Sequence, residues 1–120
     1  MIRDIRPAAP FHFLVISKIH LRNLNSVSRE ASRYAPLTPS DFLQKMGEIG
    51  RMAVQQQANQ TNFQEEELRI GFHKPPFNSV LHLHLHVIYP YREMNFIAKL
   101  FYGRGVPWFA SLEDAKKYWI

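Results

Sequence analysis

The stretch at residues 79–89 constrains the fold of this chain most strongly, because histidine and aliphatic residues alternate strictly within it. Side chains two residues apart lie on the same face of a β-strand. The alternation therefore predicts one strand over Ser79 to Tyr89, with a polar face and an apolar face. The polar face would carry His82, His84 and His86, and the apolar face Leu83, Leu85 and Val87. We expect the apolar face to join the core and the three imidazoles to form a site, since imidazoles are costly to bury without partners.

Several further elements are predicted along the chain, and together they indicate one α+β domain over residues 1–120. Thr38 as N-cap, Pro39 at the first position and Asp41 in the first turn predict a helix that runs to about Gln57. The remaining predicted elements are a strand at 11–17, a surface loop at 18–28, a strand at 68–72, a bend at 74–78, a short helix at 96–101 and a last helix at 111–118.

The long predicted helix carries one apolar stripe that we expect to be buried. It consists of Phe42, Met46, Ile49 and Ala53, with Leu43, Gly50 and Val54 beside them. In the predicted strand at 68–72, Leu68, Ile70 and Phe72 alternate with Arg69 and Gly71, which is typical of a half-buried strand.

The composition excludes several classes of protein. The chain has no cysteine, which excludes disulfide scaffolds, thiol nucleophiles and zinc sites with thiolate ligands. No apolar run approaches the roughly 20 residues of a membrane span, and no segment resembles a signal peptide, so we expect neither membrane insertion nor secretion. The formal net charge of +5 is compatible with an anionic partner.

Two kinds of chemistry fit three imidazoles on one strand. A metal ion is one, but same-face residues are roughly 6.6 Å apart, so the outer pair would be about 13 Å apart and only two could ligate one ion. Nucleotidyl transfer is the other: one neutral imidazole attacks phosphorus, and its neighbours stabilise charge on the phosphate oxygens. The spacing of the three histidines favours nucleotidyl transfer over metal binding.

The same residues carry a resemblance to a known family. His82 to Ile88 matches the HxHxHxx signature of the histidine triad (HIT) superfamily. The segments Asp4 to Ile16 and Gly71 to Phe77, together with Trp108-Phe109, resemble the Hint branch, most closely its third paralogue type. The resemblance implies a HIT-like antiparallel sheet with a long helix packed on it. The domain would be N-terminally shortened, because a helix and a strand pair normally precede the position of Asp4.

The resemblance also implies a role for each matching residue. His84 would be the nucleophile, His86 would contact phosphate oxygens, and His82 and His12 would complete the catalytic pocket. Asp4 would bind the ribose, Ile5 would line the nucleoside pocket, and Ser79 would lie near the leaving group. No metal or other cofactor is implied. His20 and His73 are expected to have structural roles.

By this resemblance, the chain would cleave the P–N bond of adenosine 5'-phosphoramidates, and also acyl- or aminoacyl-adenylates, through a nucleotidyl-histidine intermediate. The expected partner is a purine nucleotide such as AMP, not a nucleic acid or a membrane. We expect a homodimer in the cytoplasm or the nucleus. The alternatives are an aprataxin-like hydrolase of adenylated nucleic-acid ends, a nucleotide-binding module without turnover, and a metal-binding protein.

Overall fold

The computed structural model describes residues 2–4, 6–58, 62–77 and 80–120, which are arranged around one antiparallel sheet. The strand order is β1-β2-β4-β3-β5. The strands are β1 (Ile2–Arg3), β2 (Phe11–Ile16), β3 (Arg69–His73), β4 (His84–Tyr89) and β5 (Phe109–Ser111). The predicted α+β class and antiparallel sheet are confirmed, whereas the sequence patterns had indicated neither β1 nor β5.

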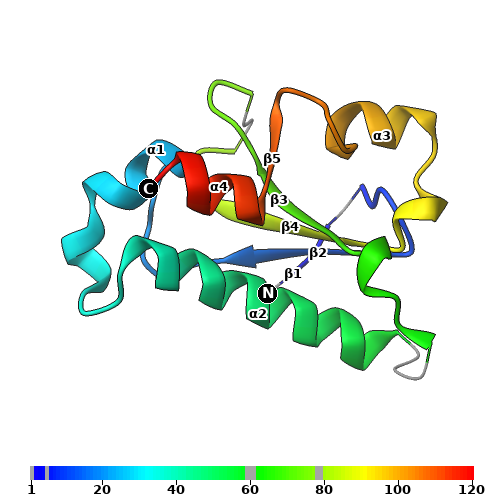
Figure 1. Cartoon of the computed structure of the whole chain (residues 1–120), viewed down its shortest axis with the longest axis horizontal. Coiled ribbons are helices and arrows are strands. Elements are labelled where there is room, and N and C mark those ends of the chain that lie inside the picture. Colours follow the sequence, from blue (N-terminus) through cyan, green and yellow to red (C-terminus); the bar gives the residue numbers. More distant parts are fainter. Residues whose placement is uncertain (1, 5, 59–61, 78–79) are drawn as a thin grey trace.

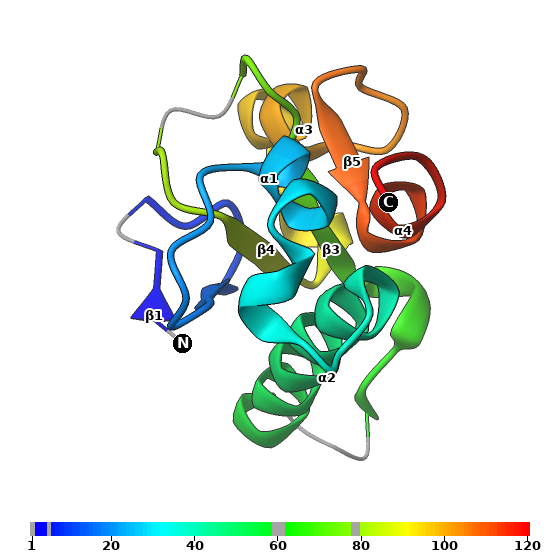
Figure 2. The same ribbon diagram turned by 90° about the vertical axis from the view of Figure 1, so that its left-hand side faces the viewer.

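The helices cover both sides of this sheet. They are α1 (Leu24–Arg29), α2 (Pro39–Gln57), α3 (Phe96–Tyr102) and α4 (Leu112–Tyr118), with short 3-10 turns at Ala31–Tyr34, Glu65–Glu67 and Tyr91–Glu93. The long helix α2 runs along one side of the sheet, and α3 lies on the opposite side (Figures 1 and 2). None of the helices among the described residues is long and apolar enough to cross a membrane.

Helix α2 begins and ends where the sequence predicts. The Thr38 hydroxyl accepts a hydrogen bond from the Asp41 N–H at 3.1 Å. The prediction that Ile49 is buried is wrong, because its side chain is 45% exposed. The buried face passes instead through Gly47 and Gly50, which allow α2 to approach α4 and the sheet closely. Because α2 packs closely at these two glycines, Ile49 lies outside the buried side of the helix.

The segment predicted as a surface loop, residues 18–28, is buried in part. Leu21, Leu24 and Val27 are fully buried and contribute to the core, and α1 forms where no helix was expected. Leu24 and Val27 lie on one side of α1 by their three-residue spacing, and Leu21 lies in the segment that precedes the helix. The Asn23 side chain caps α1 by accepting a hydrogen bond from the Asn25 N–H at 2.9 Å.

Two predicted strands differ in detail from those observed. β4 begins at His84, later than predicted, and residues 80–82 form a bend in front of it. Arg69, expected on the exposed face of its strand, is buried. Its guanidinium donates to the carbonyl oxygens of Tyr102 at 2.8 Å and Gly103 at 3.0 Å, which compensates for its burial. The predicted helices at 96–101 and 111–118 are confirmed as α3 and α4.

The strand register divides the sheet into two faces. Residues directly opposite each other in neighbouring strands share a face. The face toward α2 forms the core and includes Phe13, Val15, Leu85 and Val87, as the alternation predicted. The other face carries the histidines of β2, β3 and β4.

Candidate active site

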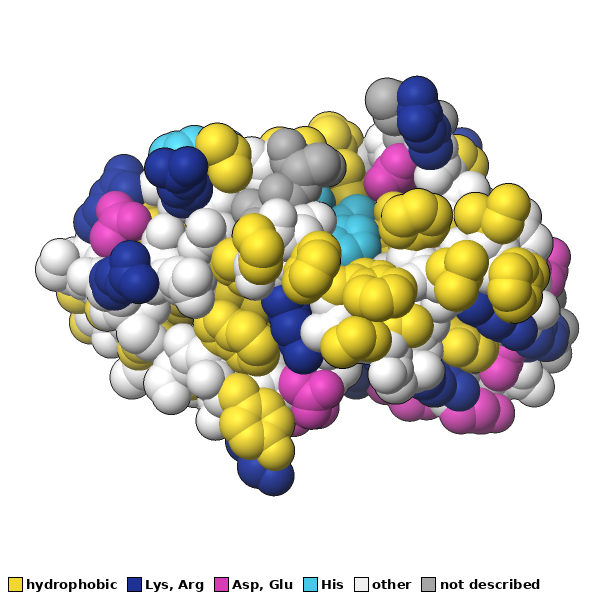
Figure 3. Space-filling model, turned by 90° about the horizontal axis from the view of Figure 1, so that it is seen from above, with side chains coloured by type: hydrophobic (Ala, Val, Ile, Leu, Met, Phe, Trp, Pro, Cys, Tyr) yellow, Lys and Arg dark blue, Asp and Glu magenta, His cyan; other side chains and the backbone are white. Residues whose placement is uncertain are grey.

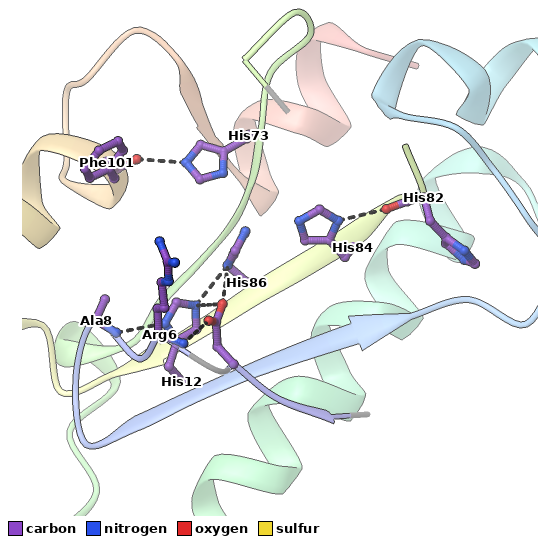
Figure 4. A network of polar contacts seen from close by, with 9 residues as sticks. Arg6, Ala8, His12, His73, His82, His84, His86 and Phe101 are labelled. Atoms are coloured by element: carbon purple, nitrogen blue, oxygen red, sulfur yellow. Dashed lines mark hydrogen bonds and ion pairs between the residues drawn. The ribbon is translucent and has the colours of Figure 1, made fainter. Parts of the chain in front are cut away.

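Three strands bring histidines together on the face away from α2. In the register of β2 with β4, His86 lies opposite Leu14 and His84 opposite Ile16, so His12 of β2 shares their face. On the other side of β4, Gly71 of β3 lies opposite His86. A Cβ at Gly71 would meet the Ala110 carbonyl and the Phe109 ring, so the glycine allows β5 and this ring to lie close to β3. Figure 4 shows the imidazoles gathered on this side of the sheet.

His84 has a defined tautomer. Its Nδ1 lies 2.8 Å from the carbonyl oxygen of His82. A carbonyl only accepts hydrogen bonds, so Nδ1 carries the hydrogen and donates. The neutral ring therefore keeps its lone pair on Nε2, which is the form that a nucleophilic histidine requires.

His12 and His86 form a hydrogen-bonded pair whose direction is also defined. The Ala8 N–H donates to His12 Nδ1 at 2.9 Å, so neutral His12 carries its hydrogen on Nε2. That Nε2–H faces His86 Nδ1 at 2.9 Å, which leaves the hydrogen of His86 on its own Nε2. His86 Nε2 is buried and has no hydrogen-bond partner among the described residues. The pair thus presents one unsatisfied N–H donor inside the site.

Asp4 lies beside this pair. Its N–H donates to the His12 carbonyl at 2.8 Å, and its Oδ1 accepts the Arg6 N–H at 2.8 Å. Its Oδ2 lies 3.4 Å from His12 Nε2 and 4.0 Å from His86 Nδ1. The carboxylate therefore places a negative charge next to the two imidazoles.

Burial favours the neutral form of three histidines of the site, His12, His86 and His73. It lowers the pKa of His12 to about 4, against the opposing effect of Asp4 and with smaller contributions from His73 and His84. Burial also lowers the pKa of His86 well below its ordinary value, and the nearby His84, His12 and His73 lower it further. The pKa of His73 is lowered for the same main reason, burial. A hydrogen bond between two neutral rings, not an ion pair with Asp4, thus joins His12 to His86 at neutral pH.

The ring of His82 does not join the other two histidines of the motif. Its Nε2 lies 3.1 Å from the Ser17 carbonyl, and its ring contacts that of His20. The ring is therefore turned away from His84, as Figure 4 shows. The prediction of three imidazoles on one strand face is therefore wrong for His82, because β4 begins only at His84. His82 contributes its carbonyl to the site. The predicted residues Ile5 and Ser79 lie outside the described residues.

Three aromatic residues that were not predicted as site residues enclose His86. The ring centroids of His73 and Tyr102 lie 5.1 and 5.0 Å from that of His86, and the centroid of Phe109 lies 6.0 Å away. Burial, together with the nearby Asp4, raises the pKa of Tyr102 to about 12, so its phenol stays neutral. No periodicity could have identified Tyr102 and Phe109, because their place depends on how α3 and β5 fold back onto β3.

One group of side chains in the site has the composition of a metal site. The ligand atoms of Asp4, His12 and His86 all lie within 4.8 Å of one another. However, the Ala8 N–H occupies the lone pair of His12 Nδ1, so an ion on Nε2 would require loss of that bond or an imidazolate. The hydrogen bonding therefore favours a proton, not a metal ion, between His12 and His86.

The open side of the site is a pocket next to His84. Its lining includes His73, His84, Arg22 and Asn23. Seen from above in Figure 3, a histidine side chain lies at the bottom of a hollow bordered by hydrophobic side chains. His84 itself is half-buried and lines this small pocket.

Comparison with known proteins gives consistent matches. The family described as "Scavenger mRNA decapping enzyme C-term binding" matches residues 1–101. The chain is 34% identical over 111 residues to "Adenosine 5'-monophosphoramidase HINT3" of Mus musculus, covering 92% of this chain and 61% of that protein. It is 32% identical over 112 residues to the protein of the same name from Xenopus tropicalis, covering 93% and 66% of the two chains.

A plant relative carries a different name. The chain is 40% identical over 84 residues to "Bifunctional adenosine 5'-phosphosulfate phosphorylase/adenylylsulfatase HINT4" of Arabidopsis thaliana, covering 70% of this chain and 50% of that protein. The chain thus spans about half to two thirds of the length of these curated relatives. The family match, the antiparallel sheet and the histidine motif agree with one another, and the chain belongs to the scavenger mRNA decapping enzyme C-terminal binding family, within the histidine triad superfamily.

Proposed function

We propose that this chain is an adenosine 5'-monophosphoramidase that cleaves the P–N bond through a covalent nucleotidyl intermediate on His84. The observation that carries the proposal is the 2.8 Å hydrogen bond from His84 Nδ1 to the His82 carbonyl. It leaves the lone pair of the neutral ring on Nε2, and His84 is a half-buried residue that lines a small pocket. The names of the relatives from mouse and frog support the choice of substrate.

In the first step, His84 Nε2 attacks the phosphorus of the phosphoramidate. The Nε2–P bond forms, the P–N bond breaks, and the leaving nitrogen departs with the electron pair and takes a proton from solvent. The ring now carries a positive charge, because Nδ1 keeps its hydrogen. The His82 carbonyl, which accepts that hydrogen, stabilises the charge.

In the second step, water attacks the same phosphorus. The Nε2–P bond breaks and its electron pair returns to His84, so the neutral ring is regenerated. The products are AMP and the proton released by the attacking water. Both steps need hydrogen-bond donors for the phosphoryl oxygens. The buried Nε2–H of His86, which has no partner among the residues that the structure describes, is such a donor.

The nucleoside would be bound by residues that the family resemblance assigns. Asp4 would bind the ribose hydroxyls, Ile5 would contact the base and Ser79 would lie near the leaving group. The names of the relatives share an adenosine 5'-phosphate group and differ in what is attached to it. We therefore include acyl- and aminoacyl-adenylates among the substrates to be tested.

We also propose that the chain forms a homodimer through α2 and the edge of the sheet. Ile49 and Met52 of α2 are 45% and 57% exposed, which is unusual for large apolar side chains on the long helix of a small domain. Light scattering of the purified chain, compared with a variant in which both are changed to Gln, tests the dimer. A monomeric wild-type chain would contradict it.

The test of the function combines turnover with detection of the adduct. Wild-type chain, His84→Ala and the control His20→Asn are mixed with a slow adenosine phosphoramidate in the presence of a chelator, and intact masses are measured after an alkaline quench. We expect turnover and a nucleotidyl adduct in the wild type and in His20→Asn, and neither in His84→Ala. Turnover by His84→Ala, or turnover without any adduct on His84, would contradict the proposed intermediate. A folded wild-type chain without activity would favour the nucleotide-binding module.

A further inference from the structure

A patch of exposed apolar side chains lies beside the histidine site. Four of the seven residues of α3 are large, apolar and between 45% and 78% exposed: Phe96, Ile97, Leu100 and Phe101. Residues four apart are neighbours on a helix, so these side chains form one continuous strip. Helices on a protein surface normally turn polar side chains toward solvent, so this face of α3 indicates a binding surface.

Two aromatic residues extend this strip toward the segment that follows β3. The Trp108 Nε1–H donates to the Leu100 carbonyl at 2.8 Å, which holds the indole against α3. The ring centroids of Trp108 and Phe77 lie 6.2 Å apart, and Phe77 is 59% exposed. We call Phe77, Trp108 and the four residues of α3 the apolar patch.

The apolar patch is continuous with the histidine site through His73. The Phe101 carbonyl can only accept, so His73 donates its Nε2–H to this oxygen, at 3.0 Å. His73 also lines the pocket that His84 lines. Figure 4 shows His73 between Phe101 and His84, and Figure 3 shows hydrophobic side chains around the hollow that contains a histidine. A ligand with its phosphate at the histidines would therefore have the patch next to it.

The strand order indicates which part of a ligand meets the patch. Asp4, the proposed ribose ligand, lies between β1 and β2 at one side of the sheet. His84 lies on β4 in the middle, and His73 on β3 and Trp108 just before β5 lie toward the other side. A substrate that places its ribose at Asp4 and its phosphorus at His84 thus extends its leaving group toward the patch.

We propose that the apolar patch binds the hydrocarbon chain of a fatty acyl-adenylate, whose carboxylate is the leaving group. The inference rests on the proposed function of His84 and narrows its substrate class. The phosphate and the ribose are polar and belong with the histidines and Asp4, whereas a hydrocarbon chain is stabilised by leaving water. The patch offers that chain aromatic and aliphatic side chains that are otherwise exposed.

The reaction of such a substrate needs no co-reactant other than water. His84 Nε2 attacks the phosphorus, the Nε2–P bond forms, and the bond from phosphorus to the acyl oxygen breaks. The fatty carboxylate leaves with the electron pair, and water then releases AMP from His84 as in the phosphoramidate reaction. A carboxylate leaves without a proton at neutral pH, so the apolar side chains do not have to supply one.

Binding of unreactive analogues tests the patch without turnover. The full chain is titrated calorimetrically with two acyl sulfamates of adenosine, in which a sulfamate replaces the phosphate, one with an acetyl and the other with a decanoyl group. Each buried methylene strengthens binding roughly fourfold, so even partial burial of the longer chain predicts at least about 30-fold tighter binding. Equal affinities for the two analogues overturn the proposal.

Two matched variants test where the chain binds. Ile97→Gln/Phe101→Gln removes two exposed apolar side chains from the patch, and Ile49→Gln/Met52→Gln removes two from α2, on the opposite side of the sheet. We expect the first variant to reduce the preference for the decanoyl analogue by at least about fivefold, and the second to keep the wild-type preference. A preference that persists in a folded Ile97→Gln/Phe101→Gln variant overturns the proposal. Equal affinities in the wild type, combined with loss of a dimer in this variant by light scattering, would assign the patch to a second copy of the chain.

Turnover separates this proposal from the proposed function. The wild-type chain is given adenosine 5'-phosphoramidate, acetyl-adenylate and decanoyl-adenylate, and we expect kcat/KM to be at least about tenfold higher for decanoyl-adenylate than for acetyl-adenylate. Hydrolysis of all three without preference for the longer chain overturns the proposal and leaves the proposed function intact. Selective binding of the decanoyl analogue without turnover of any substrate contradicts the proposed function and supports the patch as a binding site for the chain.

Discussion

His12 Nε2 donates a hydrogen bond to His86 Nδ1 across 2.9 Å, and a backbone amide fixes its direction. Because the Ala8 N–H occupies His12 Nδ1, the hydrogen of neutral His12 must be on Nε2, and that of His86 on its outer nitrogen. In many enzymes a carboxylate orients the catalytic histidine. Here the Ala8 N–H, which lies before β2, fixes the tautomer of His12, and His12 in turn fixes that of His86.

This chain of hydrogen bonds predicts different effects for two substitutions of His12. In His12→Gln an amide N–H can replace the Nε2–H, whereas in His12→Asn the shorter side chain cannot reach His86. We expect His12→Asn to lower kcat by about 100-fold, since a wrongly oriented histidine is a poor catalyst. His12→Gln should retain at least about tenfold more of the activity.

Steady-state turnover of a fluorogenic adenosine phosphoramidate measures both variants, with circular dichroism to confirm folding. Equal loss in the two variants would mean that His12 acts through packing alone. Unchanged kcat in His12→Asn would mean that the orientation of His86 does not limit the reaction.

The lowered pKa of His12 predicts that acid destabilises the fold. In the unfolded chain His12 takes up a proton near pH 6.5, but in the folded chain only near pH 4. The unfolded state therefore binds more protons between these values, so the free energy of unfolding is greatest above pH 6.5 and falls as the pH drops toward 4. The contribution of His12 alone is roughly 3 kcal/mol, and His86 and His73 act in the same direction.

Urea denaturation between pH 7.5 and pH 4.5 measures this dependence. Carboxylates also titrate at the lower end of the range, so the comparison of wild type with His12→Gln isolates the histidine. We expect a flatter dependence in the variant, and identical slopes would contradict a buried neutral His12.

The fold could be predicted from the sequence wherever a local signal decided it. Thr38 and Pro39 set the start of α2, and the alternation of Leu83, Leu85 and Val87 identified the core face of β4. The extent of α1 and the pairing of β5 could not be predicted, because both depend on contacts with distant segments. Leu21 illustrates this, since its carbonyl accepts the N–H of Leu83 far along the chain.

The candidate site was predictable in its residue types but not in its arrangement. The motif identified His84 and His86, and the resemblance added His12 and Asp4, all of which lie together. The motif could not reveal that the ring of His82 leaves the site, because that depends on where β4 begins. Nor could it place Tyr102, whose position is set by the buried Arg69.

Arg69 holds the end of α3 over the site, which predicts a large effect on stability. Its guanidinium donates to two backbone carbonyls and lies 4.8 Å from the centroid of the Phe109 ring. Arg69→Met leaves both acceptors without their donors, which we expect to cost about 2–4 kcal/mol. Arg92→Met is the control: it removes an exposed ion pair with Glu67 and should cost less than about 1 kcal/mol.

Urea denaturation compares the two arginine variants. The turnover of Arg69→Met is measured under conditions where it remains folded, because a displaced Tyr102 should lower kcat/KM. Equal stability of the two variants would mean that Arg69 does not anchor α3.

An added methyl group at two glycines of the core is predicted to change the free energy of unfolding by different amounts. A Cβ on Gly71 would overlap the backbone carbonyl of Ala110, which cannot move without breaking the pairing of β3 with β5. A Cβ on Gly47 would meet only the end of the Leu112 side chain, and alanine favours the helix by about 1 kcal/mol. We expect Gly71→Ala to lower the free energy of unfolding by about 3 kcal/mol, and Gly47→Ala to change it by less than about 1 kcal/mol.

The two variants also differ in their expected effect on catalysis. Gly71 lies opposite His86 and its added Cβ would press on Phe109, whereas Gly47 lies on the far side of the sheet. Denaturation curves and turnover of the folded variants are measured together. A Gly71→Ala variant as stable and active as Gly47→Ala would mean that β5 can move away from β3 without disturbing the catalytic imidazoles.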